Sequence, residues 1–141
     1  MQPKISVVTL AVADLERAVR FYRDGLGLPT DGIVGSEFDH GAVAFFDLAG
    51  GLRLALWPRA SIAADAGLPV GAPSPTELTL GHNVASEHAV DVVMAEAAAA
   101  GATALKAAQP TFWGGYAGYF QDPDGHVWEV VHDPAWSLPS E

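Results

Sequence analysis

The sequence predicts an α+β fold in which two tandem βαβββ modules, residues 4–58 and 76–133, form curved mixed sheets around a cavity. Three observations support this fold. A strand followed by a capped helix occurs twice, a hairpin with a glycine turn follows each helix, and a segment rich in Ala, Gly, Pro and Ser separates the two halves. We therefore expect one domain over residues 1–141, with residues 59–75 as a linker or surface loop.

The first module opens with the β-branched run KISVVTLAV, which is typical of a strand. Asp14 follows this run and is a good helix N-cap. The segment after Asp14 has apolar residues at helical spacing and stops at Gly27. The stretches AVAFFDL and LRLALWP then predict a hairpin around the turn AGG. The apolar stripe of the helix consists of Leu15, Ala18, Val19, Tyr22 and Leu26.

The second module repeats this order. The strand ELTLGHNV precedes a helix capped by Ser86, and GYFQDPDGHVWEVV predicts a hairpin with DPDG as its turn. Val12 and Val84 each lie two residues before a cap, an offset of 72 residues. The hairpin turns end at Gly51 and Gly125, an offset of 74. Each module leaves one sheet face to be covered, which favours pairing of two modules or of two copies of the chain.

Strand alternation assigns side chains to the two faces of each sheet. Leu10 and its alternate neighbours are expected to pack on the helices. His82 and Trp128 fall on the same side by parity, so we expect a buried, hydrogen-bonded histidine and a core tryptophan. The concave face, by the two offsets, carries Thr9, Trp57, Thr79, Asn83 and Glu129.

Composition excludes several classes of function. The chain has 7 Lys and Arg against 17 Asp and Glu, a net charge of −10, which argues against nucleic acid as a partner. It has no basic amphipathic stretch, which argues against a membrane surface. Cysteine is absent, so disulfides, thiolate metal sites and a cysteine nucleophile are excluded. The N-terminus lacks the pattern of a secretory signal, and we expect a cytoplasmic protein.

Three segments are informative when taken together, namely VADLERAVRFYRDGLGL, HNVASEHAVDVVMAEAAAAGA and FQDPDGHVWEV. They resemble the vicinal oxygen chelate superfamily, which includes glyoxalase I, bleomycin-resistance proteins, fosfomycin-resistance enzymes and extradiol dioxygenases. The resemblance covers nearly the whole chain. It implies the same two-module fold and a homodimer, since members of this family commonly pair across a two-fold axis.

The resemblance also implies four metal-ligand positions, which fall on Val7, Ala55, Thr79 and Glu129. Only Glu129 is a strong ligand. Val7 and Ala55 cannot ligate through their side chains, and Thr79 offers a neutral hydroxyl. Because zinc, iron and nickel need several N, S or O⁻ ligands, we expect no bound metal and no cofactor.

Aromatic residues suggest instead a site for a small organic molecule. Trp57 has the parity of the concave face, and Trp113 stands in FWGGY, where two glycines allow a tight turn. Aromatic walls with a few polar groups suit a small aromatic or apolar-polar ligand, although plain core packing also accounts for them. The expected ligand-binding residues are Thr9, Trp57, Thr79, Asn83, Trp113, Tyr116 and Glu129.

The role of Glu129 decides between the functions. A carboxylate within an apolar strand costs free energy unless it is paired, and it could also be a relic of a metal-binding ancestor. We expect Glu129 to be a polar anchor or a latent catalytic base of a metal-free binding protein. The alternatives are an enzyme of the lyase, isomerase or dioxygenase type, using a recruited metal or Glu129 as general base, and a dimeric scaffold without a ligand.

Overall fold

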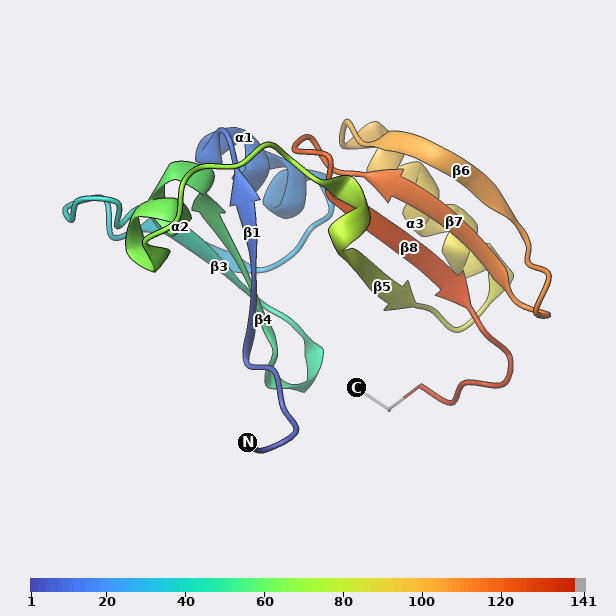
Figure 1. The fold of residues 1–141 in the computed structure, drawn as a ribbon. Coiled ribbons are helices and arrows are strands. Elements are labelled where there is room, and N and C mark those ends of the chain that lie inside the picture. Colours follow the sequence, from blue (N-terminus) through green and yellow to red (C-terminus); the bar gives the residue numbers. More distant parts are fainter. Residues whose placement is uncertain (139–141) are drawn as a thin grey trace. The chain divides into compact units, whose positions relative to one another are not determined.

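The computed structural model describes residues 1–138, which belong to two compact units, Met1–Ala72 and the part of the chain from Pro73 onward. Each unit contains one four-stranded mixed sheet with helices packed on one of its faces (Figure 1). The predicted α+β fold of two βαβββ modules is therefore confirmed. Among the described residues, none of the helices has the length and apolar character needed to cross a bilayer.

The sheet of the first unit has the strand order β1-β4-β3-β2. Strands β1 and β4 pair in parallel, and the other two pairs are antiparallel. A short 3-10 turn, Ala49–Gly51, closes the β3–β4 hairpin where the sequence predicts a glycine turn. The elements are β1 (Val7–Val12), α1 (Leu15–Val19), η1 (Arg20–Gly25), β2 (Thr30–Val34), β3 (Val43–Asp47) and β4 (Arg53–Pro58).

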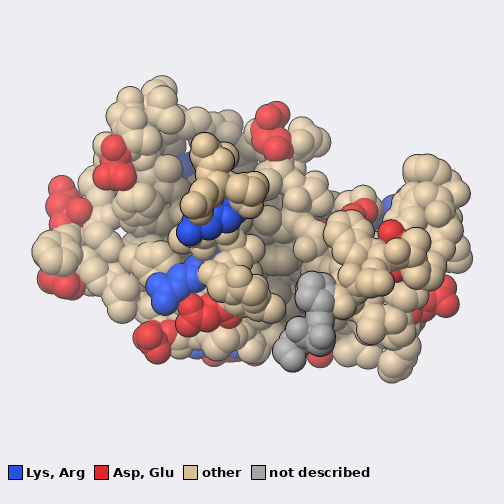
Figure 2. Space-filling model, turned by 90° about the horizontal axis from the view of Figure 1, so that it is seen from below, with Lys and Arg blue, Asp and Glu red and all other residues tan. Residues whose placement is uncertain are grey.

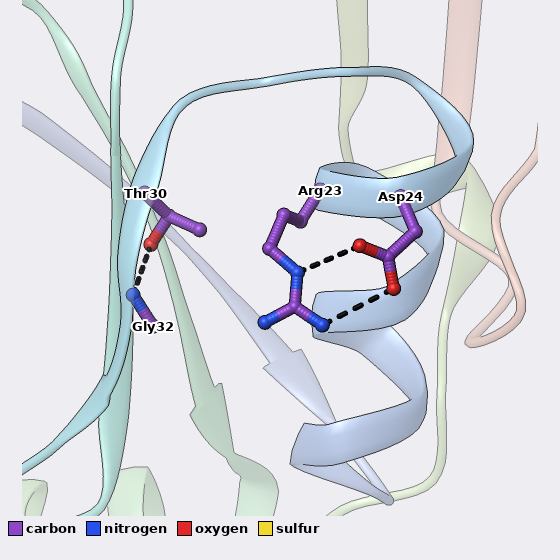
Figure 3. A network of polar contacts seen from close by, with 4 residues as sticks. All are labelled: Arg23, Asp24, Thr30 and Gly32. Atoms are coloured by element: carbon purple, nitrogen blue, oxygen red, sulfur yellow. Dashed lines mark hydrogen bonds and ion pairs between the residues drawn. The ribbon is translucent and has the colours of Figure 1, made fainter.

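The helix of the first unit begins as predicted, because the Asp14 carboxylate accepts the backbone N–H of Arg17 at 3.1 Å. Its second half, η1, widens into a π-helical turn. At the end of η1 the Arg23 guanidinium pairs with Asp24 at 2.8 Å (Figure 3). Figure 3 also shows the Thr30 hydroxyl accepting the N–H of Gly32 at 3.1 Å, at the start of β2.

The segment after β4 differs from the expected loop. Residues 59–66 form helix α2 (Arg59–Ala66), which packs on β4 and β1. Its own residues Ser61 and Ala63 are buried, and Gly67 ends the helix with a left-handed φ of 72°. The sequence did not predict this helix, because its apolar positions are mostly alanines. These small residues give little difference in hydrophobicity between the two faces of the helix.

The sheet of the second unit has the strand order β5-β8-β7-β6, so β8 and β7 are its inner strands. Helix α3 packs against β6, β7 and β8, and the Ser86 hydroxyl caps it by accepting the N–H of Ala89 at 3.0 Å. In the predicted DPDG turn, Asp122 accepts the backbone N–H groups of Asp124 and His126. The elements are η3 (Pro75–Glu77), β5 (Thr79–Asn83), α3 (Glu87–Ala99), β6 (Thr103–Pro110), β7 (Tyr116–Gln121) and β8 (Val127–His132).

Burial follows the predicted alternation in part, because Ala55 and Val131 on the other face are buried as well. Leu10 and Val12 are buried in the first unit, and Val130 is buried in the second. Trp128, which the sequence placed in the core, is only half-buried, and His82 is exposed where the sequence predicted a buried histidine. His82 is exposed because β5 is an edge strand and α3 packs mainly over the other three strands.

Candidate functional site

Glu129 lies on the inner strand β8 of the second sheet. Its neighbours across the strand pairings are Gly81 on β5 and Tyr119 on β7. The next residue, Val130, is buried on the face that α3 covers, so Glu129 points to the opposite face, where it is half-buried. This is the face on which the sequence placed it.

The Glu129 carboxylate is paired with a phenol. The Tyr119 hydroxyl donates a short hydrogen bond to Glu129 Oε2. This bond raises the pKa of Tyr119 above its usual value, with smaller contributions from burial and from the charge of Glu129. The carboxylate therefore has one satisfied oxygen, and Oε1 accepts no hydrogen bond from residues 1–138.

A row of four residues crosses the sheet at this level. Lys106 on β6 is opposite Tyr119, Tyr119 is opposite Glu129, and Glu129 is opposite Gly81. A side chain at position 81 would lie beside Glu129, and glycine leaves that space open. Along this row an ammonium, a phenol and a carboxylate are neighbours, and the next position, Gly81, has no side chain.

A pocket of about 260 Å³ lies over this row. That volume is just below the range of roughly 300–1,000 Å³ that is usual for small-molecule sites. Within it, one end is polar and the other aromatic. The residues with polar or aromatic side chains that line it include Lys106, Gln109, Glu129, Phe112, Trp113 and Tyr119.

The loop between β6 and β7 forms the aromatic end of the pocket. The Thr111 hydroxyl accepts the N–H of Gly115 at 2.8 Å, and the Thr111 N–H donates to the Gly115 carbonyl at 2.9 Å. A Cβ on Gly115 would come within 2.2 Å of the Trp113 ring, so only glycine lets the indole fold back here. Phe112, beside it, is fully exposed.

The other predicted residues of the second unit are placed differently. Thr79 and Asn83 share the sheet face of Glu129, opposite Val127 and Val131, but they do not line this pocket. Tyr116 lies on the helix side, where its hydroxyl donates to Asp91 of α3 at 2.7 Å. That bond raises the pKa of Tyr116, and the structure does not bring its side chain together with Glu129.

Trp57 and Thr9 belong to the first unit. Thr9 is exposed and lies opposite Ala55. The Trp57 indole donates to the carbonyl of His40 at 2.9 Å and lines a separate pocket of about 380 Å³ beside α2. The two tryptophans expected to share a site therefore line different pockets, one in each unit.

Sequence reasoning missed several of these contacts. The His40 ring lies 3.1 Å from the Ser61 hydroxyl across 21 residues of sequence, and no local pattern indicates it. Tyr119 could have been found, because counting back from the DPDG turn places it opposite Glu129 in the hairpin. Lys106 and Gln109 could not, since two register irregularities in β6 decide which side chains face the pocket.

The family's four ligand positions provide few metal donors. In the first unit Val7 is exposed and Ala55 is buried, and both side chains are aliphatic. In the second unit Thr79 lies opposite Val127, and only Glu129 carries a charge. Within residues 1–138 no group of three or more His, Asp or Glu side chains is arranged to hold a metal ion. The residues present do not fit a transition metal of the kind this family uses.

The fold and sequence agree with one family. Residues 4–130 match the model of the Glyoxalase/Bleomycin resistance protein/Dioxygenase superfamily. The chain belongs to this superfamily, as its three motifs suggested. A comparison with curated proteins found no match.

Solved structures with the same fold include enzymes and resistance proteins. A glyoxalase-related enzyme from Fulvimarina pelagi is 33% identical over 98% of this chain and 94% of its own, with a TM-score of 0.83. A lactoylglutathione lyase from Agrobacterium tumefaciens is 24% identical over 99% of this chain and 100% of its own, with a TM-score of 0.68. The fosfomycin resistance protein FosX from Listeria monocytogenes is 22% identical over 96% of this chain and 97% of its own, with a TM-score of 0.69. The last two are similar in fold alone.

Proposed function

We propose that this chain is a metal-independent small-molecule-binding member of the superfamily, and that its ligand lies in the pocket over Tyr119 and Glu129. The observation that carries this proposal is the hydrogen bond from the Tyr119 hydroxyl to Glu129 Oε2, at the floor of a pocket with an aromatic end. The bond orients the carboxylate and leaves its second oxygen to accept an N–H or O–H from a ligand.

The donor chemistry supports binding without a metal. Glu129 is the single charged residue among the four family positions, and its carboxylate is engaged by Tyr119. Structural and catalytic zinc sites use three or four protein ligands, which this set cannot supply. The ligand is therefore recognised by side-chain hydrogen bonds and ring contacts.

The ligand itself is a small aromatic or apolar-polar organic molecule. Trp113 and Phe112 supply flat apolar surface, while Lys106, Gln109 and Glu129 supply polar groups. Aromatic rings gain stacking energy on such walls, and polar groups set the orientation.

Tryptophan fluorescence tests this proposal. A screen of aromatic compounds is expected to yield ligands that quench emission in the parent and in Trp57→Phe, but not in Trp113→Phe. Trp57→Phe is the matched control, because Trp57 lines a different pocket in the other unit. A screen in which no compound changes the emission of the parent, or in which the quenching disappears with Trp57, would reject this pocket as the binding site.

A second candidate function is proton-transfer catalysis, favoured by the same Tyr119–Glu129 pair. Glu129 would accept a proton from a bound substrate and become neutral, and the Tyr119 hydroxyl would then donate a hydrogen bond to the negative charge left on the substrate. Turnover assays on the compounds that bind distinguish the two functions. If Glu129→Gln binds a ligand normally but loses its turnover, the protein is an enzyme; if nothing is turned over by the parent, binding is the function.

A further inference from the structure

The second module contains a single lysine and no arginine, and that lysine lies at the pocket. From residue 73 to residue 141 the sequence has nine Asp and Glu but only one Lys and no Arg. That one residue, Lys106, lines the pocket that contains Glu129. Figure 2 shows acidic side chains spread over the face in view, with basic side chains gathered at its left centre.

The Lys106 ammonium has no charged partner among the residues that the structure describes. Among residues 1–138 it makes no ion pair and no side-chain hydrogen bond, although the module around it carries many carboxylates. The charge of Lys106 is therefore available to pair with an anionic ligand. Because the rest of the module is strongly acidic, the ammonium of Lys106 also provides a local positive potential that attracts an anion.

The row across the sheet sets the distance between the two charged groups. Lys106 and Glu129 lie on β6 and β8, with Tyr119 on β7 between them. Two strand spacings separate their backbones by roughly 10 Å, and the flexible lysine stem shortens the gap between the charges. A small ring lying over Tyr119 can span this gap with a substituent at each end.

We infer that the pocket takes an aromatic zwitterion, a small ring compound with a carboxylate at one end and an amine at the other. This inference rests on the proposed function and narrows it to one class of ligand. The carboxylate pairs with Lys106, the amine donates to the free Oε1 of Glu129, and the ring lies over Tyr119 beside Trp113. Each charged end meets one group of opposite charge, which favours one orientation of the ligand.

Four matched compounds test this inference by titration calorimetry at low salt. They are 4-(aminomethyl)benzoate, benzoate, benzylamine and the neutral 4-methylbenzamide. The first is expected to bind most tightly. Because exposed ion pairs contribute up to about 1 kcal/mol, removing either charge from the compound should weaken binding by about three- to fivefold. Added salt should reduce this difference, since it screens both pairs.

Variants identify which protein group meets which end. Lys106→Met is expected to weaken binding of the zwitterion and of benzoate while leaving benzylamine unchanged. Glu129→Gln is expected to do the reverse, affecting the zwitterion and benzylamine. Lys4→Met is the matched control, because Lys4 is the other lysine of the chain, is exposed and lies in the first unit.

Three outcomes would overturn the inference, and none of them by itself rejects the proposed function. If the neutral amide binds as well as the zwitterion, the pocket binds aromatic compounds without reading their charge. If none of the four compounds binds, the class is wrong, and the wider fluorescence screen decides the proposed function separately. If Lys106→Met changes no affinity but makes the protein associate, Lys106 serves instead to deter pairing at the edge strand β6.

Discussion

Tyr119 and Glu129 are direct partners across the β7–β8 hairpin, and the tyrosine hydroxyl donates its hydrogen bond to the carboxylate. The corresponding pair of the first module, by the 74-residue offset, is Phe45 and Ala55, which are also opposite each other. The two modules therefore place an apolar pair and a polar pair at the same level of their sheets. At this level, the second sheet therefore has a hydroxyl and a carboxylate that can bind a ligand or transfer a proton, and the first sheet has neither.

The charge of Glu129 should govern the titration of Tyr119. In Glu129→Gln the hydroxyl faces a neutral acceptor, so the hydrogen bond weakens and the pKa of Tyr119 should fall towards the usual tyrosine value. Absorbance of tyrosinate during an alkaline titration measures this. Asp91→Asn is the matched control, because it should shift Tyr116 instead. An alkaline titration identical to that of the parent would contradict the pairing.

The same pair should make stability depend on pH at the alkaline end. Because the pKa of Tyr119 is raised in the folded protein, its contribution is fully present below the unfolded value of about 10 and is lost as the pH rises through the folded value. Urea unfolding across this range should show a loss of stability in the parent that is smaller in Tyr119→Phe. Equal losses in both proteins would show that Tyr119 does not contribute.

Gly115 should be necessary for the aromatic end of the pocket. Gly115→Ala puts a methyl group where the Trp113 ring and the His132 carbonyl lie, at 2.2 Å and 2.9 Å. The ring must move, which should change the near-UV circular dichroism, weaken ligand binding and cost about 1 kcal/mol of stability, the low end for overpacking, because the loop is at the surface. Gly71→Ala, which meets nothing within 4 Å, is the control and should behave as the parent.

The purified protein should contain no stoichiometric transition metal. The four family positions hold Val7, Ala55, Thr79 and Glu129, which supply one charged donor where several are needed. Elemental analysis after dialysis, with and without earlier incubation in excess zinc, measures this. About one zinc, nickel, iron or manganese per chain surviving dialysis would show that other residues form a site.

We expect the chain to form a homodimer. Each sheet has two unpaired edge strands and one face that carries no helix, and closed two-fold pairing is the commonest way to cover such surfaces. Light scattering at micromolar concentration should give twice the chain mass of 14.7 kDa. A mass of one chain throughout a dilution series would contradict this expectation.

Local patterns in the sequence were sufficient for the repeat, for both capped helices and for both hairpins, but not for helix α2 or the strands β2 and β6. Asp14 and Ser86 cap helices as predicted, and the DPDG turn sets the β7–β8 register that places Tyr119 opposite Glu129. These features depend on residues close together in the chain, whose turn and capping preferences act locally. Alternation then determined which face of β8 carries Glu129.

Tertiary structure decided which side chains share a pocket. The irregular pairing of β6 brings Lys106 and Gln109 to the face of Glu129, and the α3 side of the sheet takes Tyr116. Trp57 lines a different pocket from Trp113, although both were expected to contact the ligand. Such placements depend on bulges, on which sheet face a helix covers, and on contacts between distant segments. A repeating pattern of apolar residues in the sequence does not specify any of these.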